Sequence, residues 1–324
     1  SEWERWNAYV RAHPNGTVFH TTGWLNALSD DSRVFVDESD GEIAGGIALA
    51  TTKRFGLTSY HIPPYTPYGG PLFGNEKIGY RCEGSTYNEF IQKIFAAVGP
   101  AGHLDFVLPT SDQDLLPYKW SGFDIGVGIT YHLSDGDGAL RNGALEKKIN
   151  DGCRRQLKKL LRLHEAGTIT ATWDDRRDAV VDIQTQLASR KKFDPHGHTL
   201  RRLLERTEPG TFRSLLLTAE GEGDLAGCIG AVDEKRYYNL IVATRSNLSA
   251  EYRHIGVLMY YLIMRDALES GRTFDFEGSS IPGIAHFYRQ MGGEQVPTFR
   301  LQKTRSPYYA ALRFAKALRA ARSG

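Results

Sequence analysis

Two short stretches of this 324-residue chain resemble each other: HLDFVLPTS at 103–111 and TFDFEGSS at 273–280. Each follows an amphipathic helical pattern, which covers 87–98 in the first case and 257–268 in the second. A strand-like stretch after a helix, repeated in the same order, indicates two copies of one domain in the chain.

The similarity extends in both directions from this pair. Upstream, GEIAGGIA at 41–48 corresponds to GDLAGCIG at 223–230, and downstream 127–133 corresponds to 296–301. Strand and helix patterns follow one another within each copy. We therefore predict a mixed α/β fold of two tandem domains, each with a mixed sheet flanked by helices, and a cleft between them.

The sequence DGDG at 135–138 marks the predicted boundary between the two domains. The first domain is expected over 1–135 and the second over 136–324. A basic helix predicted over 139–166 links them. Another basic helix, predicted over 307–322, could touch RNA or a membrane surface, or dock on the protein as a terminal helix.

Composition excludes several classes of protein. Hydrophobic residues make up 41% and charged residues 24%, as in globular proteins, and no run of 18 apolar residues predicts a membrane span. The first residues lack the basic start and apolar stretch of a secretory signal, so none is expected in this chain, and the odd, widely spaced cysteines favour a reducing cytoplasm. The three cysteines are widely spaced and the histidines scattered, so we expect neither a disulfide framework nor a metal site.

The segment EYRHIGVL at 251–258 lies between a predicted strand and a predicted helix. Arg253, Gly256 and the free N–H groups at the helix start, including that of Val257, could bind an anion. The alternative is a loop that caps the helix without any ligand.

Asp275 and Glu277 lie two residues apart on a strand predicted over 272–277, so both should project from one face. A carboxylate at this place could act as general base toward an amine. The alternative is structural: Asp275 would accept hydrogen bonds from backbone N–H groups, and Glu277 would pair with an arginine.

Two other segments are candidates for binding. Arg154, Arg155 and Lys158 belong to a strongly basic helical stretch that suits a polyanion such as tRNA, a nucleotide diphosphate or an acidic lipid. Tyr65 and Tyr68 project from a proline-rich loop and could line a binding cleft. The alternatives are a solvated helix face and hydrophobic loop packing, respectively.

Several segments together resemble the Fem-type transferases of GNAT fold over about residues 3–303. They are VFHTTGWL at 18–25, PYGGPL at 67–72, RRQLKK at 154–159, and FDFEGS at 274–279 followed by FYR at 287–289. In addition, Arg253 and Gly256 match the pyrophosphate loop of GNAT acyltransferases, whereas Leu258 departs from it. A bulky residue there is expected to crowd a phosphate, which argues against an acyl-CoA donor.

The resemblance implies two GNAT-like domains, with the acceptor side in the first and the donor side in the second. It implies attack of an acceptor amine on an activated acyl carbon without a cofactor. Aminoacyl-tRNA is the expected donor and a peptide bond the product. Acyl-CoA is the alternative donor, and a non-catalytic RNA- or envelope-associated protein is a further alternative.

The resemblance also suggests residue roles. The implied proton handlers are Glu277, Asp275 and Tyr288; the implied donor-binding residues are Arg253, Gly256, Val257 and Arg289; and the implied substrate contacts are Trp24, Tyr65, Tyr68, Arg154, Arg155 and Lys158. Two lysines of the bridge-forming members are replaced here, by Leu28 and Tyr288. The expected acceptor is therefore a small amine, an amino acid or a secondary-metabolite scaffold rather than a nucleotide-linked muropeptide.

Overall fold

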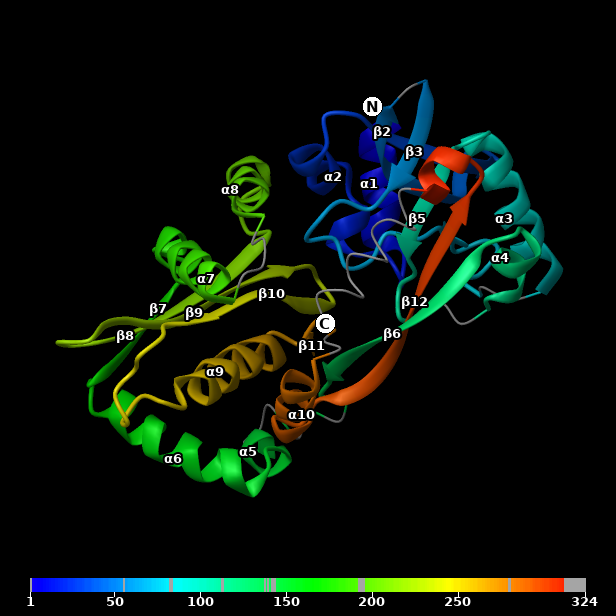
Figure 1. The fold of residues 1–324 in the computed structure, drawn as a ribbon. Helices are drawn as coiled ribbons and strands as arrows, with labels where there is room; N and C mark the ends of the chain where they lie inside the picture. The colour runs from blue at the N-terminus through cyan, green and yellow to red at the C-terminus, as the bar shows by residue number, and fades with distance from the viewer. Residues whose placement is uncertain are drawn as a thin grey trace. The chain divides into compact units, whose positions relative to one another are not determined.

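The computed structural model describes residues 2–311, apart from 55, 82–83, 112–113, 137, 139, 141–143, 192–195 and 279–280. The chain forms two compact units (Figure 1). Unit 1 comprises Ser1–Gly128 and the segment from Pro297 onward, and unit 2 comprises Ile129–Val296. The chain therefore passes between units twice, whereas the sequence suggested one boundary at 135/136.

Unit 1 is built on a mixed sheet. Its antiparallel strands precede a helix that leads to a parallel strand, β5, because β3 pairs parallel with β5 and α3 makes the crossover. The elements are α1 (Glu2–Ala12), η1 (Val18–His20), α2 (Thr22–Leu28), β1 (Ser32–Ser39), β2 (Glu42–Arg54), β3 (Leu57–His61), β4 (Leu72–Phe73), α3 (Gly84–Val98), β5 (His103–Val107) and α4 (Leu116–Trp120).

Unit 2 repeats this plan, with an antiparallel run β7-β8-β9-β10, a crossover helix α9 and a parallel strand β11. Its elements are the second half of β6 (Asp124–Leu133), which begins in unit 1, and α5 (Leu145–Lys148), α6 (Asp151–Glu165), β7 (Ile169–Trp173), α7 (Arg177–Lys191), α8 (Gly197–Arg206), β8 (Phe212–Ala219), β9 (Gly223–Val232), β10 (Arg236–Thr244), α9 (Ile255–Glu269), β11 (Thr273–Asp275) and α10 (Pro282–Gln290).

The last strand of each half pairs with the other half. Strand β6 follows α4 in the chain but lies antiparallel to β11 of unit 2. Strand β12 (Glu294–Thr304) follows α10 but lies antiparallel to β5 of unit 1. This exchange explains why the compact units do not coincide with the two halves of the sequence.

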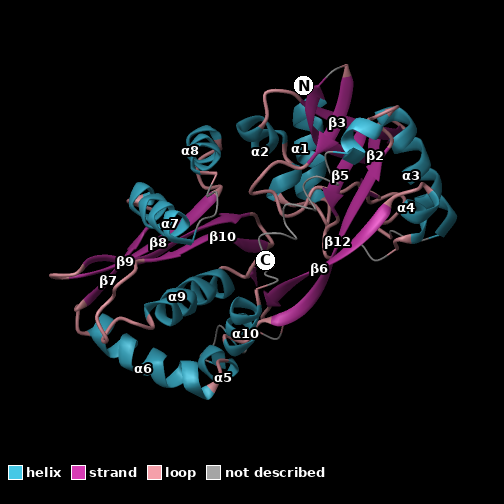
Figure 2. Ribbon diagram, in the orientation of Figure 1, coloured by secondary structure: helices cyan, strands magenta, loops and turns pink. Residues whose placement is uncertain are grey.

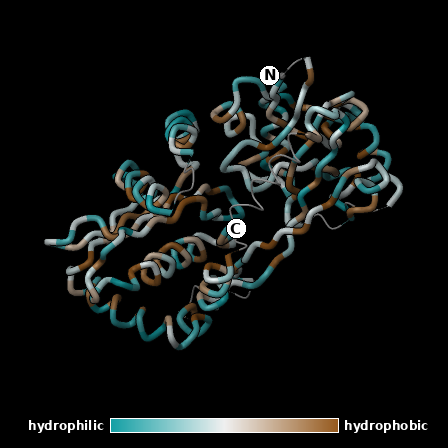
Figure 3. Tube along the Cα trace, viewed as in Figure 1, coloured by the Kyte–Doolittle hydropathy of each residue, from teal (hydrophilic) through white to brown (hydrophobic). Residues whose placement is uncertain are grey.

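Helices cover both faces of the sheet in unit 2. Helix α7 packs on β8, β9 and β10, and α9 packs on the other face, where α6 covers it (Figure 2). Helix α9 is apolar nearly all round, as in a helix buried on every side, whereas α6 is hydrophilic along most of its length (Figure 3). Within the part of the chain that the structure describes, no helix combines the length and apolarity of a membrane span.

The predicted continuous helix over 139–166 is wrong, because the helical stretch is interrupted. Ile149 adopts an extended conformation after α5, and Asn150 caps α6 by accepting a 2.8 Å hydrogen bond from the Gly152 N–H. The helix predicted over 307–322 is described only as far as residue 311, so most of it lies outside the described residues.

Candidate functional site

A cavity opens in unit 2 where two parallel strands part. Strands β10 and β11 pair only as far as Tyr238 and Asp275, after which β10 continues to Thr244 while β11 ends. Beyond that pair lies a cavity of about 760 Å³, lined by residues of α7, β10, α9 and α10 and by Phe276–Gly278. Sheets that split in this way offer a ligand both main-chain groups and side chains.

Unpaired polar groups gather in this cavity. Four of its lining residues hold buried side-chain atoms without a hydrogen-bond partner among the described residues: Gln184 Oε1, both amide atoms of Asn239, Arg245 Nε and Glu277 Oε1. Folded proteins pair nearly all of their buried polar atoms, so a concentration of unpaired ones in one cavity points to a ligand site.

Glu277 is the acidic group of the cavity. Its side chain is partly buried, and burial together with the neighbouring Asp275 carboxylate raises its pKa well above the usual value. Its φ is 59°, a left-handed conformation that costs a non-glycine residue roughly 1–3 kcal/mol and is typical of functional positions. The prediction of one strand through both acids is wrong, since β11 ends at Asp275 and the chain turns at Glu277.

Asp275 is fully buried and its carboxylate is occupied by the protein. Oδ1 accepts hydrogen bonds from Thr130 Oγ1 at 2.7 Å and from the Glu277 N–H at 3.0 Å, and Oδ2 lies 3.1 Å from His132 Nε2. These contacts favour the structural alternative for Asp275, which fixes the main chain that carries Glu277.

Two tyrosines line the cavity beside this carboxylate. The hydroxyl of Tyr260 donates to that of Tyr288 over 3.4 Å, and both side chains are almost wholly buried. Burial raises the pKa of both phenols, so both are neutral at physiological pH and can donate a hydrogen bond.

Cationic side chains also line the cavity. Arg253 is exposed and reaches it from the loop before α9, and Arg190 and Lys191 contribute further positive charge. Arg245 also lines the cavity, but its guanidinium is paired with the Glu222 carboxylate.

Gly256 lies in the first turn of α9, with open space where a Cβ would stand. The N–H groups of Ile255 and Val257 donate to the carbonyls of Tyr252 and His254, both at 2.9 Å, so the prediction that the Val257 N–H is free is wrong. What remains for a phosphate at this helix start is the Arg253 side chain and the open space beside Gly256.

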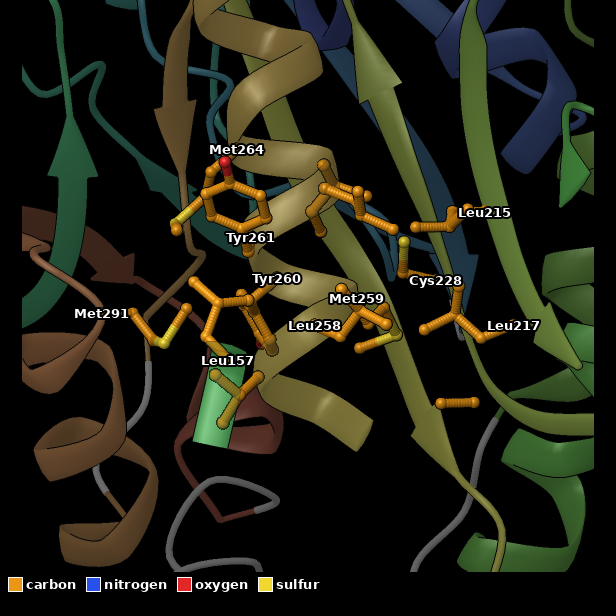
Figure 4. Close-up of a cluster of buried hydrophobic side chains, with 14 of the residues drawn as sticks. Leu157, Leu215, Leu217, Cys228, Leu258, Met259, Tyr260, Tyr261, Met264 and Met291 are labelled. Carbon is orange, nitrogen blue, oxygen red and sulfur yellow. The ribbon is translucent and has the colours of Figure 1, made fainter. Parts of the chain in front are cut away.

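The expectation that Leu258 crowds a phosphate is wrong. Its side chain is 0% exposed and packs in the core beside Met259 and Leu157 (Figure 4). Val257 is also mostly buried in this core, so it contributes its main chain rather than its side chain to the start of α9. Neither residue obstructs an anion at this helix terminus.

The predicted residues of unit 1 are mainly packing residues. Trp24 is 0% exposed and its Nε1 donates a 3.0 Å hydrogen bond to Thr66 Oγ1, and Tyr68 is also buried. Tyr65 is partly buried and has a φ of 61°. The alternative of hydrophobic loop packing therefore describes Trp24 and Tyr68 better than substrate contact does.

The remaining predicted residues lie away from the cavity wall. Arg154 pairs with Asp151, while Arg155 and Lys158 are exposed on α6, which packs on α9 and does not line the cavity. Arg289 is exposed and donates a 2.9 Å hydrogen bond to Gln295 Oε1. The structure thus brings together Glu277, Tyr288 and Arg253, but not these arginines and lysine.

Sequence reasoning missed Gln184, Asn239 and Arg245. The one available signal was Asn239, which interrupts the otherwise apolar centre of the strand RYYNLIVAT at 236–244. A single asparagine in a strand is equally typical of a solvent-facing position, so its burial could not be inferred.

Comparisons with known proteins identify the type of domain. Residues 147–288 match the family model described as an acetyltransferase (GNAT) domain. No curated protein matches the chain in sequence. Because the matched residues include Asn239, Arg253 and Glu277, the cavity lies within the GNAT domain.

Solved structures show the same fold over nearly the whole chain. The crystal structure of FemX has a TM-score of 0.67 at 16% identity, covering 92% of this chain and 95% of its own. The C-terminal domain of a provisionally named lysylphosphatidylglycerol synthetase from Agrobacterium fabrum has a TM-score of 0.58 at 14% identity (98% and 96% covered), and L-PGS from Bacillus licheniformis has 0.56 at 14% (95% and 94%). The chain therefore contains a GNAT domain over 147–288 and shares its fold with FemX and these two synthetase structures.

Proposed function

We propose that this protein is an N-acyltransferase that forms an amide bond when an acceptor amine attacks an activated acyl carbon. The observation that carries the proposal is the Glu277 carboxylate, whose buried Oε1 is unpaired in a cavity that also holds the Tyr288 hydroxyl. A carboxylate with a raised pKa is a stronger base than an ordinary one, which is what removal of a proton from an amine requires.

The proposed step divides the proton handling between these two groups. As the amine nitrogen bonds to the acyl carbon, Glu277 takes the proton that the nitrogen loses. The bond from the acyl carbon to the leaving oxygen or sulfur then breaks, and the leaving group takes a proton from the neutral Tyr288 phenol, which Glu277 reprotonates. The donor is already activated, so positioning and electrostatic stabilisation supply most of the remaining catalysis.

Aminoacyl-tRNA is the donor that we propose first. The cavity carries Arg190, Lys191 and Arg253 among its lining residues, which suits a phosphate-bearing donor. The exposed cations of α6 offer a further polyanion surface. One structural neighbour is named for joining a lysyl group to a phospholipid, which is consistent with aminoacyl transfer on this fold. A tRNA donor would place the reaction in the cytoplasm, with a small amine as acceptor.

Acyl-CoA is the second candidate, and one observation favours it. Leu258 is buried in the core and Gly256 faces open space, so the start of α9 is accessible to a pyrophosphate. The steric argument against this donor therefore fails.

Turnover with each donor tests the proposal. Purified protein is incubated with a panel of amines and either bulk aminoacyl-tRNA or acetyl-CoA, and amide products are measured by mass spectrometry. We expect product with the wild type and a loss of about 10²–10⁴-fold with Glu277→Gln. Glu269→Gln, which alters an exposed carboxylate at the end of α9, should remain as active as the wild type. A fully active Glu277→Gln variant would remove Glu277 from the mechanism.

A further inference from the structure

We propose that the side-chain amide of Asn239 donates a hydrogen bond to the acyl carbonyl oxygen of the donor and stabilises the negative charge that develops there. The inference rests on the proposed function and adds a catalytic residue to it. It is carried by the position of Asn239, by its burial without partners, and by the groups that surround it.

Asn239 stands at the point where the sheet splits. Tyr238 and Asp275 form the last pair between β10 and β11, and Asn239 is the next residue of β10. The register of β10 against β9 also shifts between Tyr238 and Ile241, which indicates a bulge at this point. Bulges commonly re-aim a side chain beside a functional site.

The amide of Asn239 is buried and unsatisfied. The residue is 3% exposed and lines the cavity, yet neither Oδ1 nor Nδ2 makes a hydrogen bond of normal geometry with any described residue. Burial raises the pKa of the neighbouring Tyr260 phenol, and the polar influence of the Asn239 amide on its hydroxyl acts in the opposite direction. A purely structural asparagine in this position would have its donor and acceptor paired.

The surroundings indicate which ligand atom the amide meets. Glu277 lines the same cavity and can accept the proton of the amine. The Tyr260 hydroxyl donates to that of Tyr288, whose own proton is assigned to the leaving group. The Asn239 amide is thus a neutral donor in a buried place, beside the groups assigned to proton transfer. Such a donor stabilises a carbonyl oxygen most strongly when that oxygen becomes negative, as in an oxyanion hole.

The step remains balanced with this residue included. The amine nitrogen bonds to the acyl carbon, its proton passes to Glu277, and the carbonyl electron pair moves onto the oxygen that Asn239 Nδ2 contacts. When the carbonyl re-forms, the bond to the leaving group breaks. No covalent bond to Asn239 forms or breaks, so the residue acts through hydrogen bonding alone.

Asn239→Leu tests the inference, because leucine has a similar shape and cannot hydrogen-bond. We expect kcat to fall about 10²–10³-fold, as when one oxyanion donor is removed, while KM changes by less than about threefold. We also expect the melting temperature of the free protein to rise, since a buried unpaired amide is replaced by an apolar group. Gln186→Leu, on the exposed side of α7 and away from the cavity, is the control and should leave kcat unchanged.

The outcomes separate this inference from the proposed function. Turnover by the wild type together with an unchanged kcat for Asn239→Leu would overturn the role of Asn239 alone. A lowered melting temperature with a raised KM would assign the amide to the fold and also overturn it. Absence of turnover by the wild type with every donor and amine would overturn the proposed function, and the assigned carbonyl with it.

Discussion

Asp275 and Glu277 have different roles: Asp275 is structural, and Glu277 is the candidate base. Asp275 accepts hydrogen bonds from the protein, including one from the Glu277 N–H, while Glu277 keeps a buried oxygen unpaired. The negative charge of the first raises the pKa of the second. The structural carboxylate therefore both positions the candidate base and tunes it.

The pH dependence of turnover follows from this arrangement. A general base must be ionised, so kcat/KM should rise with pH and level off only above the raised pKa of Glu277. The remaining kcat/KM of Glu277→Gln should not show this rise with pH. The measurement is the pH profile of kcat/KM for both proteins. A wild-type profile already flat from pH 5 upward would show that Glu277 does not limit the reaction.

Glu277 should also make stability depend on pH. Its pKa in the folded protein is raised above the reference value of 4.5, so folding favours the protonated form. The resulting stabilisation is complete below about pH 4.5 and is lost as the pH rises through the folded pKa. Glu277→Gln should therefore gain stability relative to the wild type as the pH rises.

Urea unfolding of the two proteins at several pH values measures this difference. The exposed Glu269→Gln variant, matched in its chemical change, should follow the wild type throughout. A constant difference between Glu277→Gln and the wild type from pH 4 to pH 9 would contradict a raised pKa in the folded state.

The residue level shows what sequence can and cannot predict. Glu277 and Arg253 could be singled out because strand and helix patterns place them beside loops, where chemical groups gather. Tyr288 is singled out by the resemblance alone, as the residue that replaces a lysine. Asn239 could not, because its role depends on a local split of the sheet that no residue pattern encodes. The prediction that Leu258 crowds a phosphate is wrong because it follows from the loop motif alone. Leu258 also falls on the apolar side of a predicted helix, and that pattern places it in the core.

At the level of elements, α6 carries an exposed cluster of positive charge. Leu157 and Leu160 are buried, whereas Arg155, Lys158 and Arg162 are exposed. The helix begins at an asparagine cap that was not predicted, although the five residues INDGC at 149–153 interrupt the basic pattern. Between β1 and β2 the chain makes a two-residue hairpin turn, with Asp40 and Gly41 both at positive φ.

Charge reversal on α6 tests whether this helix binds tRNA. The triple variant Arg155→Glu, Lys158→Glu and Arg162→Glu should weaken tRNA binding and reduce the salt slope by about 0.7–0.9 for each phosphate that the helix no longer neutralises. Filter binding over a salt series measures both quantities. The matched control reverses three exposed lysines of unit 1: Lys53, Lys77 and Lys119. Equal weakening in the two triple variants would reveal only a nonspecific effect of net charge.

At the level of the whole molecule, the exchange of β6 and β12 makes each unit depend on a distant part of the chain. In unit 1, Arg300 of β12 donates to both oxygens of Asp105, at 2.7 and 2.6 Å, across a sequence separation of 195 residues. These bonds help to hold the pKa of Asp105 well below its usual range. The internal repeat indicated two self-contained halves, because sequence similarity shows shared patterns but not which strands pair.

This dependence predicts how fragments behave. Residues 1–135 alone lack β12, so β5 loses a partner strand, Asp105 loses Arg300, and the fully buried Leu301 is missing from the core. We expect this fragment to melt without cooperativity or to aggregate through its open strand edge. Residues 1–128 joined to 297–324 through a short glycine-serine linker should instead melt cooperatively. A short linker suffices because Gly128 lies beside Thr298.

Circular dichroism during thermal unfolding distinguishes the two fragments, and the same linked fragment carrying Leu301→Asp is the control for a true core. That variant should lose the cooperative transition, since it buries a charge in the position that Leu301 fills. An equally cooperative transition in residues 1–135 would mean that the first half folds without β12. The exchanged strands would then serve to join two independent domains, rather than to complete each of them.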